Sequence, residues 1–157
     1  MKVAKFFLTI LTVLPLACLL NSCTDDDDRV PVSSLPDKTE TFIARYYPNT
    51  AVQSVDKLPD GAYSVNLYNS ASITFDSNDV WTEVDGNGSV LGTMLLYDQL
   101  PAKLYSYLES GGYTQNVFAI SRNSKQYSVT LLSTMLYYDR ESGEISSNTF
   151  LPGSENG

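Results

Sequence analysis

The residue types that could do chemistry in this chain are limited by one absence. The 157 residues include no histidine. Histidine is the usual general base near neutral pH and the commonest metal ligand, so a Ser-His-Asp triad is impossible here. Serine–lysine pairs stay formally open, but no flanking pattern supports one at Lys38, Lys57, Lys103 or Lys125. We therefore predict a non-enzymatic protein with no catalytic residue, no bound metal and no cofactor.

Two short motifs suggest ligand loops at first sight. Gly86-Asn87-Gly88 with Gly92 lacks the Gly-x-Gly-x-x-Gly spacing of a nucleotide loop, and no Lys-Ser or Lys-Thr follows it. Asp85-Gly86-Asn87 looks like the start of a calcium loop, but the position of the closing glutamate falls on Leu96. We interpret both stretches as turns.

Cys23 is the one residue whose surroundings predict a covalent modification. Lys2 and Lys5 precede an apolar run over residues 6–20, which is shorter than the roughly 20 residues of a membrane span. Residues 1–22 are therefore predicted to be a cleaved signal peptide. Leu20-Asn21-Ser22-Cys23 resembles a bacterial lipobox, which implies that the Cys23 thiol takes a diacylglycerol and anchors the protein to a membrane.

Two alternatives to this lipid site stay open. Cys18 is a rival, although the preceding Pro15-Leu16-Ala17 is a poorer match and lies inside the apolar run. An ordinary secretory signal that leaves Cys23 as a free thiol is the other alternative.

The stretch after Cys23 is acidic and has few apolar residues. Asp25-Asp26-Asp27-Asp28 repel one another and stay solvated, so residues 23–34 are predicted to form a flexible tether. A cysteine followed by such a run resembles the export signal of surface-exposed lipoproteins in Bacteroidetes. This implies an outer-membrane lipoprotein of the cell envelope, exposed at the cell surface. The alternative is a simple spacer that holds the domain away from the membrane.

The charge of the chain excludes one class of partner. The net charge is −8, and losing Lys2 and Lys5 with the signal would bring it to −10. Such a surface repels phosphate groups, so no nucleic acid partner is expected.

An internal repeat organises residues 35–145. Leu35-Pro36-Asp37-Lys38 matches Leu100-Pro101-Ala102-Lys103, and Tyr63-Ser64-Val65 matches Tyr127-Ser128-Val129, with an offset that drifts only from 65 to 63. The units cover about 35–85 and 100–145. Residues 86–99 form a long connection of unknown role, and residues 146–157 are expected to be a C-terminal tail.

Each unit is predicted to be a helix followed by strands. Phe42, Ile43 and Tyr46 recur at helical spacing after Pro36, whereas Tyr63, Val65 and Leu67 alternate with polar residues, as in a half-buried strand. The fold class is therefore α+β. We expect two tandem pseudo-repeats, each with a helix packed on an antiparallel sheet of three to four strands. Both helices should lie on one side, which leaves the opposite sheet face partly open.

This pattern resembles the PepSY-like, beta-lactamase-inhibitor-like family of Bacteroidetes envelope proteins. The resemblance rests on the Leu-Pro and Tyr-Ser-Val motifs above, with Tyr47-Pro48, Phe75-Asp76 and Trp81. It implies the tandem fold and a binding activity that includes inhibition of a protein partner such as a hydrolase. Three departures stand out: Asp79-Val80 where a glycine usually precedes the tryptophan strand, Gly112-Tyr113 at the second helix end, and the 86–99 connection.

Met135 and Tyr137 are the candidate binding residues. Alternation with Leu136 and Tyr138 places them on the sheet face away from the helices. Tyrosine and methionine are favoured at protein interfaces. We predict that this face binds an unknown protein, peptide or glycan; the alternative function is that of an architectural subunit in an envelope assembly. The competing structural reading is that residues 90–97 or Phe150-Leu151 fold across the same face.

Overall fold

A computed structural model provides the fold and describes residues 34–149. The predicted signal peptide, Cys23 and the tether as far as Ser33 lie outside the described residues. Phe150 and Leu151 also lie outside them.

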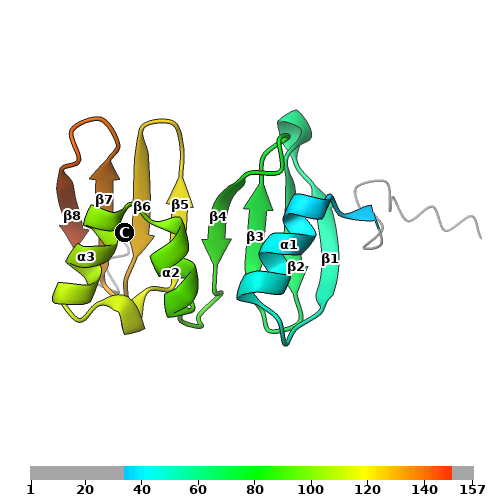
Figure 1. The fold of residues 1–157 in the computed structure, drawn as a ribbon, viewed down its shortest axis with the longest axis horizontal. Coiled ribbons are helices and arrows are strands. Elements are labelled where there is room, and N and C mark those ends of the chain that lie inside the picture. Colours follow the sequence, from blue (N-terminus) through cyan, green and yellow to red (C-terminus); the bar gives the residue numbers. More distant parts are fainter. Residues whose placement is uncertain (1–33, 150–157) are drawn as a thin grey trace, which may run out of the picture.

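One antiparallel sheet runs the whole length of the described chain (Figure 1). Its eight strands follow one another in sequence order, so each strand pairs with the strands before and after it. They are β1 Val52–Lys57, β2 Tyr63–Leu67, β3 Ser72–Phe75, β4 Trp81–Asp85, β5 Ala119–Arg122, β6 Gln126–Thr130, β7 Thr134–Asp139 and β8 Ile145–Thr149. Within residues 34–149, β1 and β8 are the two edges of the sheet.

Three α-helices cover one face of this sheet (Figure 1). Helix α1 (Asp37–Tyr46) lies over β1 to β3, whereas α2 (Thr93–Gln99) and α3 (Ala102–Ser110) lie over the second half. Pro36 and Pro101 directly precede α1 and α3, where a missing backbone N–H costs nothing. Two short 3-10 turns, η2 Pro59–Gly61 and η3 Thr114–Asn116, complete the elements.

The strand registers place the two halves of the sequence in equivalent positions. Tyr63 pairs with Lys57 and Phe75 in the first unit, and Tyr127 pairs with Arg122 and Tyr138 in the second. Each unit contributes four strands, at the upper end of the expected range, and the two sets of strands form one continuous sheet.

The hydrophobic core lies between the sheet and the helices. It is built from alternate residues of the strands, such as Val65, Ile73 and Val129, and from leucines of α2 and α3. Phe42 of α1 is only partly buried, and its ring packs edge-on against Phe75 with centroids 5.6 Å apart. Trp81, whose position the sequence left open, is 3 % exposed.

Two segments differ from the expectation. The 86–99 connection contains α2, which forms because Leu95 and Leu96 are buried against the core. The expected tail from residue 146 begins inside a strand, since β8 continues to Thr149 by pairing with β7. Residues 146–149 are exposed and carry no apolar alternation, so backbone pairing alone holds this segment in the sheet.

Candidate binding surface

The sheet face away from the helices carries two unbroken rows of side chains, which we call the open face. Directly paired residues define each row from β1 to β8. The first row is Asp56, Ser64, Thr74, Glu83, Ser121, Ser128, Tyr137 and Ser146. The second row is Ser54, Asn66, Ser72, Asp85, Ala119, Thr130, Met135 and Asn148.

The open face is polar and carries negative but no positive charge within these rows. None of its residues is buried, and most of them are serine, threonine or asparagine. Asp56, Glu83 and Asp85 add three carboxylates. Hydroxyl and amide groups both donate and accept hydrogen bonds, whereas carboxylates only accept them. The face can therefore hydrogen-bond a polar surface and favours a neutral or basic one.

Some of these polar groups are already ordered by one another. The Asn66 amide donates to the Asp56 carboxylate at 2.6 Å and to the Ser54 hydroxyl at 3.0 Å. These bonds connect β1 to β2 across the open face. A surface whose side chains are fixed in this way loses less conformational entropy on binding.

Met135 and Tyr137 are the large apolar side chains of the open face. Both are half-buried on β7, with Thr130 and Ser128 on one side and Asn148 and Ser146 on the other. Leu136 between them points into the core and is 3 % exposed. This placement follows the predicted alternation, and the binding role of the two residues stays a prediction.

One of the two segments that were expected as alternatives to cover the open face lies elsewhere. Residues 90–97 lead into and form part of α2, which covers the helix side of the sheet (Figure 1). They therefore do not cover Met135 and Tyr137. The other competitor, Phe150-Leu151, lies outside the described residues.

Tyr137 borders a polar depression of about 520 Å³ near the β7–β8 turn. Gln126, Asp139 and Glu144 also line it. The backbone N–H of Ser142 donates to Asp139 at 2.7 Å, and this bond, with those from the Ser142 hydroxyl and the Glu141 N–H, lowers the pKa of Asp139. Asp139 is therefore ionised at neutral pH, and it lines the same depression as Tyr137 and Lys103.

Two tyrosines of the first unit also have raised pKa values. Burial raises the pKa of Tyr63 to about 12; its hydroxyl lies 2.6 Å from the Thr39 hydroxyl and donates to Asp79 at 2.9 Å. Burial alone raises the pKa of Tyr47 to about 12, and its hydroxyl has no hydrogen-bond partner among residues 34–149.

A polar network connects α1 to β4 and to the end of α2. The Trp81 indole N–H donates to the Gln99 carbonyl oxygen at 2.6 Å, and the Gln99 amide donates to the Tyr46 hydroxyl at 2.6 Å. Tyr46 in turn donates to Asp98, which also accepts from Arg45 at 2.6 Å. The hydrogen bond from Arg45 is the main cause that lowers the pKa of Asp98.

Residues 34–149 contain no group of three or more histidine, cysteine, aspartate or glutamate side chains arranged to hold a metal ion. No helix in the same range is long and apolar enough to cross a membrane.

The comparison with known families agrees with this architecture. The model of the beta-lactamase-inhibitor-like, PepSY-like family matches residues 23–79 and again 61–145. The chain belongs to this family. The two overlapping matches of this PepSY-like protein are consistent with a tandem repeat, and the family resemblance drawn from the sequence is confirmed.

Solved structures from Bacteroides share the fold. A periplasmic protein of the DUF2874 family from Bacteroides vulgatus is 24 % identical, with a TM-score of 0.67 over 79 % of this chain and 98 % of that one. A proposed calcium-regulated periplasmic protein from Bacteroides thetaiotaomicron is also 24 % identical, with a TM-score of 0.66 over 80 % and 99 %. A Bacteroides vulgatus periplasmic protein of unknown function is 22 % identical, with a TM-score of 0.60 over 74 % and 94 %. None of the curated proteins matches the PepSY-like chain in sequence.

Sequence reasoning missed most of the open face. Single Ser, Thr and Asn residues in short strands give no binding signal, and their alignment into rows depends on registers between strands far apart in the sequence. The strand alternation that located Met135 and Tyr137 could have located the other members strand by strand, but not their order across the sheet.

Proposed function

We propose that this PepSY-like protein is a non-catalytic binding module and that the open face is its working surface. The single observation that supports this most is that two rows of polar side chains cross all eight strands without a helix over them in the described chain. Polar side chains alone are enough to keep a sheet face solvated, yet this face also carries the large side chains of Met135 and Tyr137. Side chains of these types are favoured at protein interfaces.

The partner that fits this surface is a protein with a neutral or basic contact region. Asp56, Glu83 and Asp85 lie in the part of the face formed by β1 to β4, whereas Met135 and Tyr137 lie on β7. A partner would therefore place polar or basic groups over the first unit and an apolar group near Tyr137. The family's beta-lactamase-inhibitor-like description supports inhibition of such a partner as the outcome of binding.

We also propose that the module is held at the cell envelope through a lipid on Cys23. The lipobox-like Leu20-Asn21-Ser22-Cys23 and the acidic run that follows support an outer-membrane anchor and display at the cell surface. The structural neighbours are described as periplasmic, which agrees with export but favours neither leaflet. Two or three acyl chains would give stable anchoring, whereas a single chain would not.

A second candidate function is an architectural subunit of an envelope assembly. The continuity of the open face across all eight strands favours it, because an extended surface suits a permanent interface as well as a transient one. Native electrophoresis of detergent-solubilised membranes separates the two functions. A stable high-mass band would support assembly, and a monomeric band would support a transient binder.

Site-specific photocrosslinking tests the proposed surface. A photoreactive phenylalanine analogue at position 137 should crosslink to one partner in intact cells, whereas the same analogue at Tyr68 should not. Tyr68 is a matched control because it is 70 % exposed and lies in the turn after β2, outside the two rows.

Tyr137→Ala should then weaken capture of that crosslinked partner by about 30-fold, since tyrosine anchors at interfaces contribute about 2 kcal/mol. Tyr68→Ala should leave capture unchanged. Unchanged capture by Tyr137→Ala, together with a large loss of thermal stability, would show that the residue is structural.

A further inference from the structure

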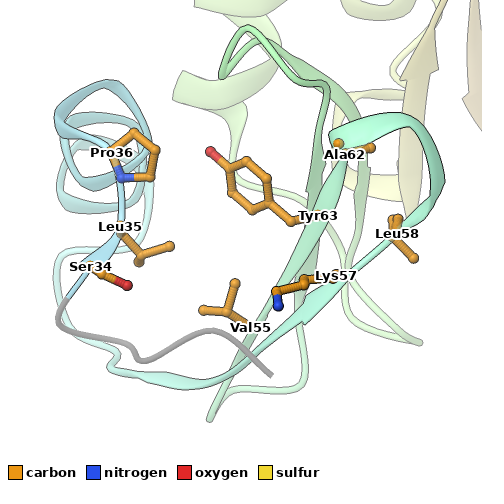
Figure 2. Close-up of a pocket in the computed structure, with 9 residues that line it drawn as sticks. Ser34, Leu35, Pro36, Val55, Lys57, Leu58, Ala62 and Tyr63 are labelled. Atoms are coloured by element: carbon orange, nitrogen blue, oxygen red, sulfur yellow. The ribbon is translucent and has the colours of Figure 1, made fainter. Parts of the chain in front are cut away.

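A pocket of about 250 Å³, here called the edge pocket, opens beside β1 at the end of the sheet. It lies between the entry to α1 and the β1–β2 hairpin, and its lining is mostly apolar (Figure 2). Leu35, Pro36 and Val55 form its inner wall, and Leu58 lies at its hairpin side. The open face is on the other side of the sheet, so this pocket is a separate site.

The equivalent place in the second unit is occupied by Trp81. Its indole N–H donates to Gln99 at 2.6 Å, the Arg122 guanidinium lies 4.1 Å from the ring centroid, and the Tyr127 ring centroid lies 6.4 Å away. Trp81 reaches these residues because its strand, β4, pairs with β5.

Each of these three partners of Trp81 has a counterpart in the edge pocket. The repeat relates Gln99 to Ser34, Arg122 to Lys57 and Tyr127 to Tyr63, and all three counterparts line the pocket. The registers agree, since Lys57 pairs with Tyr63 as Arg122 pairs with Tyr127. The edge pocket is thus the first unit's copy of the Trp81 site.

What differs between the two sites is the neighbouring strand. In the second unit β4 pairs with the outer side of β5 and supplies the tryptophan. In the first unit no strand among residues 34–149 pairs with the outer side of β1. Such an edge is a template for adding another strand.

We propose that the edge pocket and β1 form a docking site for an extended segment of another protein. The segment pairs antiparallel with β1, as β4 pairs with β5, and inserts an aromatic side chain into the pocket. Main-chain pairing gives affinity in this mode of recognition, and the side-chain pocket gives specificity.

The chemistry of the lining selects an aromatic side chain. Lys57 holds the position from which Arg122 stacks on Trp81, and a cation over a ring face attracts aromatic rings. The volume is sufficient, since apolar cavities of about 150 Å³ hold benzene. Ser34 holds the position of Gln99 in the repeat and adds a polar group to the lining.

The chain itself is a poorer source of the inserted residue. Residues 24–33 contain no aromatic side chain, and Pro31 among them cannot donate to a ladder. In β8 of a second copy, Ile145 holds the Trp81 position and is aliphatic.

The natural probe is the strand that fills the second site. We would use the capped peptide Val-Trp-Thr-Gln-Val-Asn, which is residues 80–85 with both carboxylates neutralised to avoid repulsion by the acidic protein. The full mature chain, labelled with ¹⁵N, reports the contact through its amide signals. The expected result is saturable shifts confined to residues 52–57 and the edge pocket, with binding at least about tenfold weaker when the peptide tryptophan is alanine.

A pair of matched variants ties binding to the pocket. Leu58→Asp should weaken peptide binding about tenfold, because it places a charge at the pocket mouth. Leu132→Asp should not, since Leu132 is another exposed leucine and does not line the pocket. Tyr137→Ala should also leave peptide binding unchanged, which separates this site from the open face.

Several outcomes would overturn the proposal. The absence of a saturable shift at β1 would exclude the docking site. Equal binding by the tryptophan and alanine peptides would show that the edge pocket does not bind the aromatic side chain. Shifts at β1 and β8 on diluting the protein alone would assign the site to a second copy. Binding that appears only after Val30→Asp and Val32→Asp would assign it to the protein's own leading segment.

Discussion

Trp81 is the side chain that most directly connects the two units, so its removal should have a large effect on stability. Replacing a buried tryptophan by alanine costs about 3–5 kcal/mol through lost burial and the cavity left behind. Trp81→Ala also removes two interactions of the indole. The cation–π contact with the Arg122 guanidinium contributes about 0.5–2 kcal/mol, and the hydrogen bond to Gln99 contributes about 1 kcal/mol. Because these contributions overlap, we expect a total of about 4–6 kcal/mol.

Such a loss is comparable to the whole stability of a domain of this size, about 5–15 kcal/mol. Urea unfolding followed by far-ultraviolet circular dichroism measures it, since the chain has only one tryptophan and the variant lacks its fluorescence. Trp81→Phe retains a ring against Arg122 and Tyr127 and should cost only about 1–2 kcal/mol.

Val80→Ala is the control, because Val80 is the adjacent residue and is 41 % exposed. It should change the free energy of unfolding by less than about 0.5 kcal/mol. A loss of less than about 2 kcal/mol for Trp81→Ala would refute the reasoning. It would mean that the contact between the two units is stable without the indole.

Three further predictions concern other sites. Tyr47→Phe should raise the free energy of unfolding by about 1 kcal/mol in urea, because it removes a buried hydroxyl that has no partner among residues 34–149; a loss of stability would contradict this. The raised pKa values of Tyr47 and Tyr63, about 12 against about 10 unfolded, favour the folded state below pH 10. Stability should therefore fall as the pH rises from about 10 to 12, less steeply in the double phenylalanine variant when measured by thermal melting; equal slopes would count against the shifts. Cys23→Ala should abolish lipidation and move the protein out of the membrane fraction, or leave it unprocessed; an unmodified mature cysteine in the mass spectrum of the natural protein would disprove the anchor.

The repeat and the α+β class could be predicted because both are carried by local patterns. Leu35-Pro36 and Leu100-Pro101 mark the two helix starts, and Tyr63 and Tyr127 open strands that alternate between apolar and polar residues. These signals depend only on residues a few positions apart, so a single sequence contains them.

The segments that could not be predicted depend on tertiary contacts. In the sequence, residues 93–99 look like an apolar connection. They form a helix because Leu95 and Leu96 are buried in the hydrophobic core. Residues 146–149 have no alternation of apolar and polar side chains. They form a strand because their backbone pairs with that of β7.

The candidate sites were predictable to different degrees. Period-two alternation sufficed to place Met135 and Tyr137 on the face away from the helices. The edge pocket had no sequence signal, because it arises where a neighbouring strand is missing and only comparison with the filled Trp81 site reveals it.

The strict order of the strands has a kinetic consequence. Every strand pairs with the strand that precedes it in the sequence, so most of the pairings join segments that lie close together along the chain. Only the passage from β4 to β5 through α2 and α3 closes a long loop. Pairings between neighbouring segments close short loops, so the hairpins within each unit can form early in folding. A sheet built in this way spends little time with unpaired strands during folding, which lowers its exposure to aggregation.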